Sequence, residues 1–185
     1  MRSSRRRRSS PRSRAAGRLS ASRAAAVRIR RLRGTDLAAV IAMDGAAVEH
    51  EHRLVPLMAP TSADQRLGRR WWAGFRRWRN TAVFVAADGS RLVGMLGVDL
   101  RRARNPRMPF KRSVYLHSMW VEPCARGHRV AQRLIRHALD WSRRHGAGRA
   151  TLETAANNDA ARALYGRFGF AVQEVTMARR LRQSA

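Results

Sequence analysis

The stretch from Val121 to Ala131 has the composition of an anion-binding turn. It joins an apolar run, predicted to be a strand, to an amphipathic run, predicted to be a helix, and Pro123 ends the strand because proline cannot donate to a sheet ladder. The first backbone N–H groups of a helix lack internal partners and lie at the positive end of its dipole. Arg126, His128 and Arg129 add side-chain charge at the same place. The turn suggests a phosphate or pyrophosphate ligand, although ordinary connections can have the same pattern.

A second segment, further along the chain, carries a tyrosine that could do acid chemistry. A strand-like run, Thr151-Leu-Glu-Thr, is followed by Asn158-Asp-Ala-Ala-Arg-Ala-Leu-Tyr165 and then by Gly169-Phe170. The phenol of Tyr165 has an ordinary pKa of about 10, close to that of a thiol, so it could act as general acid toward a thiolate leaving group. The alternative is an aromatic side chain that only packs its helix on the sheet.

Together the two segments resemble the GNAT N-acetyltransferase superfamily. That family carries a strand ending in Val-x-Pro, an Arg-Gly-x-Gly-x-Gly/Ala loop and a helix, then a Glu, an Asn-x-x-Ala-x-x-Leu-Tyr segment and Gly-Phe. The order and spacings match from about Val27 to Leu181, and the segment from Asn158 to Phe170 is the most specific part. The resemblance implies an acetyl-CoA-dependent acyltransferase that moves an acetyl group to a primary amine of a small molecule or a protein, by direct attack in a ternary complex.

The resemblance also implies where the co-substrate acetyl-CoA would bind. In the family, the fourth and fifth strands splay apart to admit the pantetheine arm, and backbone groups of the fourth strand bond that arm and can polarise the thioester. Asn158 would contact the pantetheine or the cofactor backbone, with a plain helix N-cap as the alternative. The strand positions are Met119, Trp120 and Val121, and the pyrophosphate would lie in the loop of Arg126, Gly127, His128, Arg129, Val130 and Ala131.

One residue of that loop departs from the family pattern, because Arg129 stands where the family has its middle glycine. Glycine permits close approach of a phosphate or an unusual φ. If the position needs only a right-handed helical conformation, arginine is tolerated, and its guanidinium can bind phosphate directly. If the position needs a positive φ, we expect the cofactor to bind weakly or not at all. Gly127 and Ala131 keep the other small positions, which favours binding.

Glu153, in the predicted fifth strand, is the candidate base that takes the proton of the amine, directly or through a water. Some family members place a catalytic glutamate there, but a strand glutamate could equally face solvent or pair with an arginine. His117 and Tyr115 are the alternative bases. With a strand period of two, they are expected to share one face with Met119 and Val121.

The acceptor site is less well defined by the sequence. Trp71, Phe75 and Trp78 follow the spacing of one helix face, which is usually core. In the family the first two helices wall the acceptor site, so this stripe and the Glu49-His50-Glu51-His52 run could shape a pocket. We expect no metal there, because adjacent helix residues point in different directions and no further ligands are suitably spaced. The basic charge of the chain disfavours a polycationic acceptor and favours a neutral or acidic one.

The composition limits the class of protein. The chain has 185 residues, which fits one domain, and a formal net charge of +27. Its single cysteine, Cys124, suggests a reducing compartment, so we expect a cytoplasmic protein, and no apolar run approaches the roughly 18 residues of a membrane span. Residues 1–26, rich in arginine and serine, are expected to form a disordered tail that binds nucleic acid only non-specifically, followed by one GNAT-like domain over 27–185. A homodimer is compatible with the sequence.

The hydrophobic periodicity predicts an α/β fold of three layers, with a mixed central sheet of six to seven strands flanked by about four helices. Asp88-Gly89, between two apolar runs, is a hairpin signal. Strands are expected at 27–33, 81–87, 91–100, 113–121, 149–154 and 170–176, with a last edge strand to Leu181. Helices are expected from Thr35 or Asp36 to Glu51 and at 61–79, 131–145 and 159–168.

Two other functions stay open at the level of the sequence. The first is a catalytically silent family member that binds an acyl-CoA, for which Arg129 is the support. The second is a basic protein that binds nucleic acid, although the sequence has no stacking motif, recognition helix or zinc signature for specific readout.

Overall fold

The structure is a computed structural model that describes residues 19–20, 22, 26–55, 62–75, 77–103 and 106–179. Its centre is a five-stranded sheet of order β1-β2-β3-β4-β5, in which only β4 and β5 run parallel. The strands are β1 (Arg28–Arg31), β2 (Thr81–Asp88), β3 (Arg91–Arg102), β4 (Arg112–Val121) and β5 (Arg149–Thr151). The helices are α2 (Leu37–Leu54), α3 (Ser62–Phe75), α4 (Val130–Arg144) and α5 (Asp159–Gly166), with 3-10 turns η1 (Gly34–Asp36) and η2 (Pro123–Ala125).

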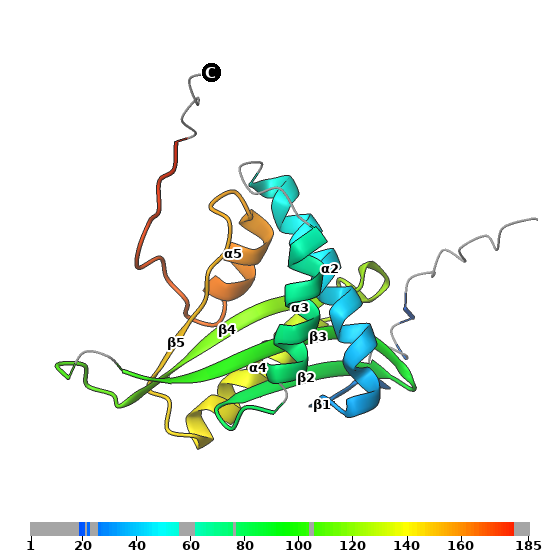
Figure 1. The fold of residues 1–185 in the computed structure, drawn as a ribbon, viewed down its shortest axis with the longest axis horizontal. Coiled ribbons are helices and arrows are strands. Elements are labelled where there is room, and N and C mark those ends of the chain that lie inside the picture. The colour runs from blue at the N-terminus through cyan, green and yellow to red at the C-terminus, as the bar shows by residue number, and fades with distance from the viewer. Residues whose placement is uncertain are drawn as a thin grey trace, which may run out of the picture.

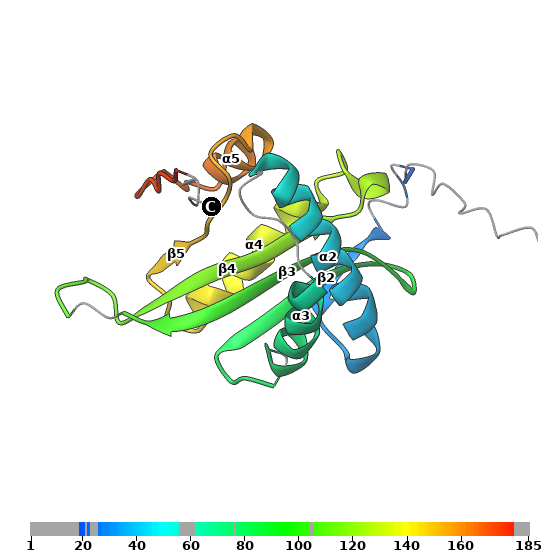
Figure 2. The same cartoon turned by 45° about the horizontal axis from the view of Figure 1, so that its top comes forward.

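Helices cover both faces of the sheet, which gives the three layers that the sequence predicts (Figure 1). Figure 2 shows α2 and α3 in front of the sheet and α4 behind it. Phe84 and Leu134 belong to the core on the α4 side, and Val40 and Trp72 to the core on the other side. Nearly every residue of β2 and of the middle of β3 is buried, because both faces of these strands are covered. The mixed sheet and the four helices confirm the expected class.

The sheet has five strands among the described residues, and not the six to seven expected. Residues 171–179 form no regular structure, and Val172, Val175 and Met177 are 65%, 77% and 91% exposed. A strand here would place Val172 and Val175 on opposite faces, so neither face would be continuously apolar. The rest of the predicted edge strand, up to Leu181, lies outside the described residues.

β4 contains one residue more than the stretch of β3 that it pairs with. Met119 pairs with Leu96, but Leu116 already pairs with Val98, so a β-bulge forms in which His117 and Ser118 together lie opposite Gly97. A bulge moves all side chains beyond it to the other face of the sheet.

The bulge overturns the expectation that four β4 side chains share one face. Tyr115 and His117 lie on the side of α3, where the ring of His117 contacts Trp71. Met119 and Val121 pack instead against the core on the α4 side. A period of two cannot predict this, because the extra residue lies inside an otherwise regular strand.

A short ion pair joins β1 to the start of α2. Asp36 accepts hydrogen bonds from both terminal nitrogens of Arg30, at 2.6 and 3.0 Å, and from the N–H of Arg33 at 2.7 Å. The hydrogen bond from Arg30 lowers the pKa of Asp36, against the opposing effect of burial. Asp36 therefore closes η1 rather than capping α2 with its side chain.

One described residue of the segment expected to form the tail contacts the domain. Leu19 is buried in the core on the α4 side, and its N–H donates to the carbonyl of Cys124 at 2.9 Å. In the described part of the chain, none of the helices has the length and hydropathy that a membrane crossing requires.

The ion pair of Asp36 gives a test of the fold. We expect Asp36→Asn to lower the free energy of unfolding by about 2 kcal/mol at pH 7, because the guanidinium of Arg30 loses a charged partner. The lowered pKa means that this contribution is present above the unfolded-state value of about 3.9 and is lost as the pH falls through the folded-state value. Urea unfolding at pH 7 and pH 3 should show the difference from wild type shrinking at the lower pH. The matched control, Asp140→Asn, removes the exposed pair with Arg143 and should change stability by less than about 0.5 kcal/mol.

The bulge gives a second test. A Cβ on Gly97 would lie 2.9 Å from Cη2 of Trp72, whose ring is fully buried, so we expect Gly97→Ala to destabilise the protein by about 1–3 kcal/mol. Gly45→Ala, in the exposed face of α2 with nothing within 4 Å, should instead stabilise by about 0.5–1 kcal/mol. Thermal unfolding of the two variants checks the opposite signs, and a neutral Gly97→Ala would contradict this account of the bulge.

Candidate active site

β4 and β5 pair only over a short distance and then part. The last pair is Tyr115 with Thr151, whereas β4 continues to Val121 with no partner on that side among the residues that the structure describes. The N–H of Glu122 donates to Val93 on β3, so by strand alternation the backbone groups of Met119 and Val121 point to the open side. The same alternation turns the backbone of Trp120 toward β3, so two of the three expected strand positions face the opening.

The loop between β4 and α4 presents unpaired backbone donors. The N–H groups of residues 127–131 donate no hydrogen bond to any described residue, and α4 has no side-chain N-cap. Gly127 has φ of 82°, which suits glycine. The side chain of Arg126 folds back on β4: its Nε donates to the carbonyl of Val121 at 3.0 Å, and its guanidinium lies 4.7 Å over the ring of Trp120. This arrangement is suited to an anion at the helix start.

Arg129 adopts the left-handed conformation, with φ of 59° and ψ of 16°. The position therefore has the positive φ under which we expected cofactor binding to suffer. A residue with a Cβ in this region costs roughly 1–2 kcal/mol. The side chain of Arg129 is exposed, so its charge is available to a phosphate at the loop.

Tyr165, on α5, is the most buried tyrosine of the site. Burial raises its pKa to about 12, and the charge of Glu51 and the neighbouring Tyr115 add to the shift. Its ring also contacts Phe170 at 5.7 Å. The phenol keeps its proton throughout the physiological range, and it lies within electrostatic reach of groups from α2 and β4.

Glu153 and Tyr115 lie together beside the parting strands. Burial raises the pKa of Tyr115, and the nearby charge of Glu153 raises it further. Arg101 opposes this effect, with its guanidinium 4.3 Å over the tyrosine ring. β5 ends earlier than expected, so Glu153 lies two residues beyond the strand and is exposed to solvent.

His117 is a neutral imidazole at neutral pH. Burial, and then the charge of Arg101, lower its pKa to about 4. Its Nε2 lies 3.9 Å from Oδ2 of Asp99, which is too long for a hydrogen bond, and it has no other partner in the described part of the protein. The ring packs against those of Trp71 and Phe75, at 4.9 and 5.1 Å.

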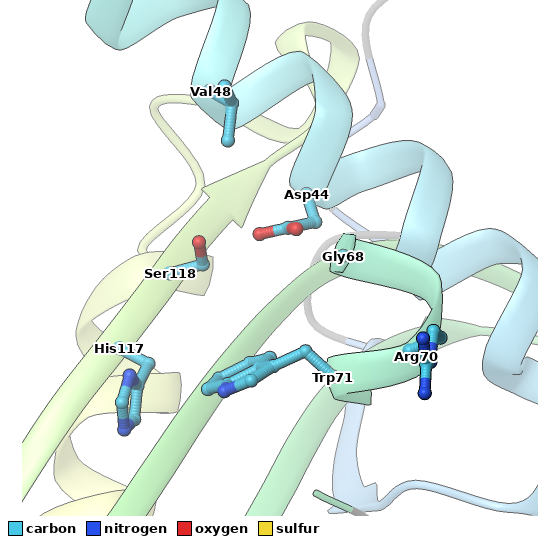
Figure 3. A pocket seen from close by; sticks show the side chains of 7 residues that line it. All are labelled: Asp44, Val48, Gly68, Arg70, Trp71, His117 and Ser118. Carbon is cyan, nitrogen blue, oxygen red and sulfur yellow. The ribbon is translucent and has the colours of Figure 1, made fainter. Parts of the chain in front are cut away.

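A cavity of about 560 Å³ opens between α2, α3 and the bulge of β4 (Figure 3). Its lining residues are Asp44 and Val48 from α2, Gly68, Arg70 and Trp71 from α3, and His117 and Ser118 from β4. In Figure 3 the carboxylate of Asp44 points across the cavity toward Ser118, and the indole of Trp71 points toward His117. Part of the predicted aromatic stripe therefore lines a cavity, whereas Trp78 follows the end of α3 and is largely exposed.

The structure brings Tyr165, Tyr115 and Glu153 into one region and gives Asn158 a different task. The side-chain oxygen of Asn158 accepts from the N–H of Ala161 at 3.2 Å, which is the N-cap alternative. Next to it, Asn157 donates to the carbonyl of Leu54 at 2.9 Å and so ties the start of α5 to the end of α2.

Sequence reasoning missed Asp44, and it gave Glu51 no role of its own. The available signal for Asp44 was an isolated acid in the apolar stretch from Ala42 to Val48. Glu51 was hidden in an alternating run of Glu and His. No group of three or more His, Cys, Asp or Glu within the described ranges is arranged to hold a metal ion.

Several solved structures share this fold. A BH1408 protein mutant from Bacillus halodurans has a TM-score of 0.72 at 18% identity, covering 83% of this chain and 99% of the other. An acetyltransferase from Clostridium acetobutylicum, solved with acetyl-CoA, has a TM-score of 0.70 at 12% identity, with 83% and 96% covered. The aminoglycoside N-acetyltransferase AAC(6')-Iy in complex with CoA has a TM-score of 0.64 at 19% identity, with 85% and 95% covered.

The sequence comparisons agree with the fold. N-alpha-acetyltransferase RimI of Mycobacterium tuberculosis is 40% identical over 95 residues, which are 51% of this chain and 54% of that protein. The chain thus spans about half the length of this curated relative. The family model described as the acetyltransferase (GNAT) family matches residues 46–170, from the middle of α2 to the end of the Gly-Phe motif. The chain belongs to the acetyltransferase (GNAT) family.

Proposed function

We propose that this protein is an N-acetyltransferase that moves an acetyl group from acetyl-CoA to a primary amine by direct attack in a ternary complex. The observation that carries the proposal is the parting of β4 from β5 directly beside a loop of free N–H groups. The extended thioester arm of acetyl-CoA fits between the parting strands, and the pyrophosphate of acetyl-CoA fits the N–H groups of the loop. The likeness to proteins solved with acetyl-CoA or CoA supports this co-substrate.

The cofactor would be bound mainly by backbone groups. Met119 and Val121 offer N–H groups at the open edge of β4, where one of them can polarise the thioester carbonyl. The N–H groups from Gly127 to Ala131 and the charge of Arg129 would hold the pyrophosphate. The strain at Arg129 belongs to the folded loop, so we assign its cost to folding stability rather than to cofactor affinity.

The reaction has a simple balance of bonds. The neutral amine nitrogen attacks the thioester carbon, the C–S bond breaks, and the amide nitrogen releases a proton. We assign that proton to Glu153, through a water, because the carboxylate is exposed beside the parting strands and close enough to Tyr115 to raise the pKa of its phenol. His117 fits this task less well, because its ring is packed against Trp71 and Phe75 instead of being exposed to solvent as Glu153 is.

Tyr165 would stabilise the sulfur that leaves. A phenol with a pKa of about 12 is a weaker acid than an ordinary thiol at about 8.5, so full proton transfer to the thiolate is uphill. Tyr165 then acts by donating a hydrogen bond to the sulfur as its charge develops, and solvent supplies the proton afterwards. This refines the role of general acid that the ordinary pKa of tyrosine suggested.

The acceptor class follows from the relatives more than from the fold. The name of RimI places its activity on α-amino groups, and that of AAC(6')-Iy on aminoglycosides. We favour an α-amino group of a peptide or protein, because RimI shares 40% identity over the matched half and the aminoglycoside enzyme only 19%.

The hydroxyl of Tyr165 can be tested by its removal. We expect Tyr165→Phe to lower kcat by about 10²–10³-fold, because the developing thiolate loses its hydrogen-bond donor, while the Kd for acetyl-CoA stays within about twofold. Release of free CoA thiol with a panel of primary amines measures the first quantity, and calorimetry measures the second. Full activity of the variant would exclude Tyr165 from the chemical step. Failure of the wild-type protein to bind acetyl-CoA would overturn the proposed function.

The side chain and the backbone strain of Arg129 can be tested separately. We expect Arg129→Ala to weaken acetyl-CoA binding by about 5–10-fold, because it removes a phosphate-binding charge and keeps the backbone strain. Arg129→Gly should weaken binding similarly but unfold at higher temperature than Arg129→Ala, by the equivalent of about 1 kcal/mol, because glycine removes the strain. If Arg129→Gly binds acetyl-CoA more tightly than wild type, the arginine impairs the cofactor site, as the silent-member hypothesis requires.

A further inference from the structure

The cavity between α2, α3 and β4 contains an acid, Asp44, that forms no ion pair with the residues that the structure describes. Asp44 is half-buried, and its Oδ2 lies against Gly68, 3.5 Å from where a Cβ would stand on that glycine. It has no ion-pair partner among the described residues, and of the cavity's lining residues in that part of the chain it is the only acid. Figure 3 shows its carboxylate directed into the open space.

Asp44 is not alone in this, because Glu51, Glu122, Glu153 and Glu174 also have no ion pair among the described residues. The chain has 39 Lys and Arg residues against 12 Asp and Glu. Several other acids are paired with arginine: Asp36, Glu49, Asp99, Asp140 and Asp159. A carboxylate that is partly removed from water is normally paired or hydrogen-bonded, since its desolvation is otherwise uncompensated. Asp44 differs from the other unpaired acids because it lines the cavity with Trp71, where a cation from outside the chain can reach it.

The other walls of the cavity also suit a cation. The indole of Trp71 offers an aromatic face, which attracts ammonium and guanidinium groups. His117 is neutral at pH 7, so it brings no repelling charge. Arg70 lies at the rim, and in Figure 3 its side chain points away from Asp44 and His117.

We propose that Asp44 and Trp71 bind a positively charged group of the acceptor that is not the amine that reacts. A carboxylate beside the reacting amine would hold it as ammonium and oppose the loss of its proton, so the two charges must be separate. The acceptor class is therefore a primary amine that carries a second positive charge, such as a diamine or an amino group near a basic side chain. This inference rests on the proposed acetyl transfer, and it reverses what the net charge of the chain suggested.

The test compares two acceptors of the same size. 1,4-Diaminobutane and pentylamine differ in one end, which is an ammonium in the first and a methyl group in the second. We expect wild-type kcat/KM to be at least about tenfold higher for the diamine, mostly through KM, from a desolvated ion pair and a cation–π contact. Asp44→Asn should reduce this ratio to near one, and Trp71→Leu should reduce it about threefold. Asp140→Asn, which removes an exposed carboxylate on α4, should leave the ratio unchanged.

Because each ratio is taken within one variant, a general loss of folded or active protein cancels. A wild-type ratio near one, or a ratio that survives in Asp44→Asn, would overturn the inference while acetyl transfer itself stands. If neither these amines nor a peptide α-amino group is acetylated, the proposed function fails, and calorimetry with 1,4-diaminobutane alone decides the cavity. If the diamine binds to the wild-type protein and not to Asp44→Asn, the cation site is supported. If it does not bind to the wild-type protein, the cation site is excluded.

Discussion

The single extra residue in β4 is the constraint on which the site depends. Because His117 and Ser118 lie together opposite Gly97, the strand presents one set of side chains to α2 and α3 before the bulge and another after it. The cavity wall and the exposed backbone of Met119 and Val121 are thus made by adjacent parts of one strand. Glycine is needed at position 97 opposite the bulge, because a Cβ there would clash with the ring of Trp72.

The local charge on one side of the site is opposite to the net charge of the chain. The surface is arginine-rich, yet the region around Tyr165 and the cavity contains Glu51, Glu153 and Asp44, and His117, which lines the cavity, is neutral. The loop at the start of α4, by contrast, combines arginines with free N–H groups. The net charge of +27 therefore agrees in sign with the side that suits a polyanionic cofactor. It is opposite in sign to the acids on the side that would bind the amine.

Much of this arrangement could be predicted from the sequence, because local signals and global fold agree. The strand, turn and helix around Arg126, and the helix that carries Tyr165, follow from periodicity and turn residues. The bulge could not be predicted, since nothing in the run from Ser113 to Val121 distinguishes a regular strand from one with an extra residue. The left-handed φ of Arg129 also runs against propensity, and the pKa values of Tyr165 and His117 depend on burial that only the packed structure defines. The apolar content after Phe170 favours a strand, but Val172 and Val175 would lie on opposite faces of that strand, so no continuous apolar face forms.

The brevity of β5 has a consequence for how the molecule opens. β5 pairs with β4 over only three residues, whereas β2, β3 and β4 pair over most of their lengths. α5 is held to the rest of the molecule by the packing of Tyr165 on the core and by the hydrogen bond from Asn157 to Leu54. Cooperative units with few shared contacts exchange their amide hydrogens independently of the global unfolding reaction. From the short pairing of β5 we expect the segment of Glu153 and Tyr165 to open more readily than the strand and loop that would bind the cofactor. A ligand that spans the gap between β4 and β5 would couple the two, so that occupancy would appear first as slowed exchange in the last third of the chain.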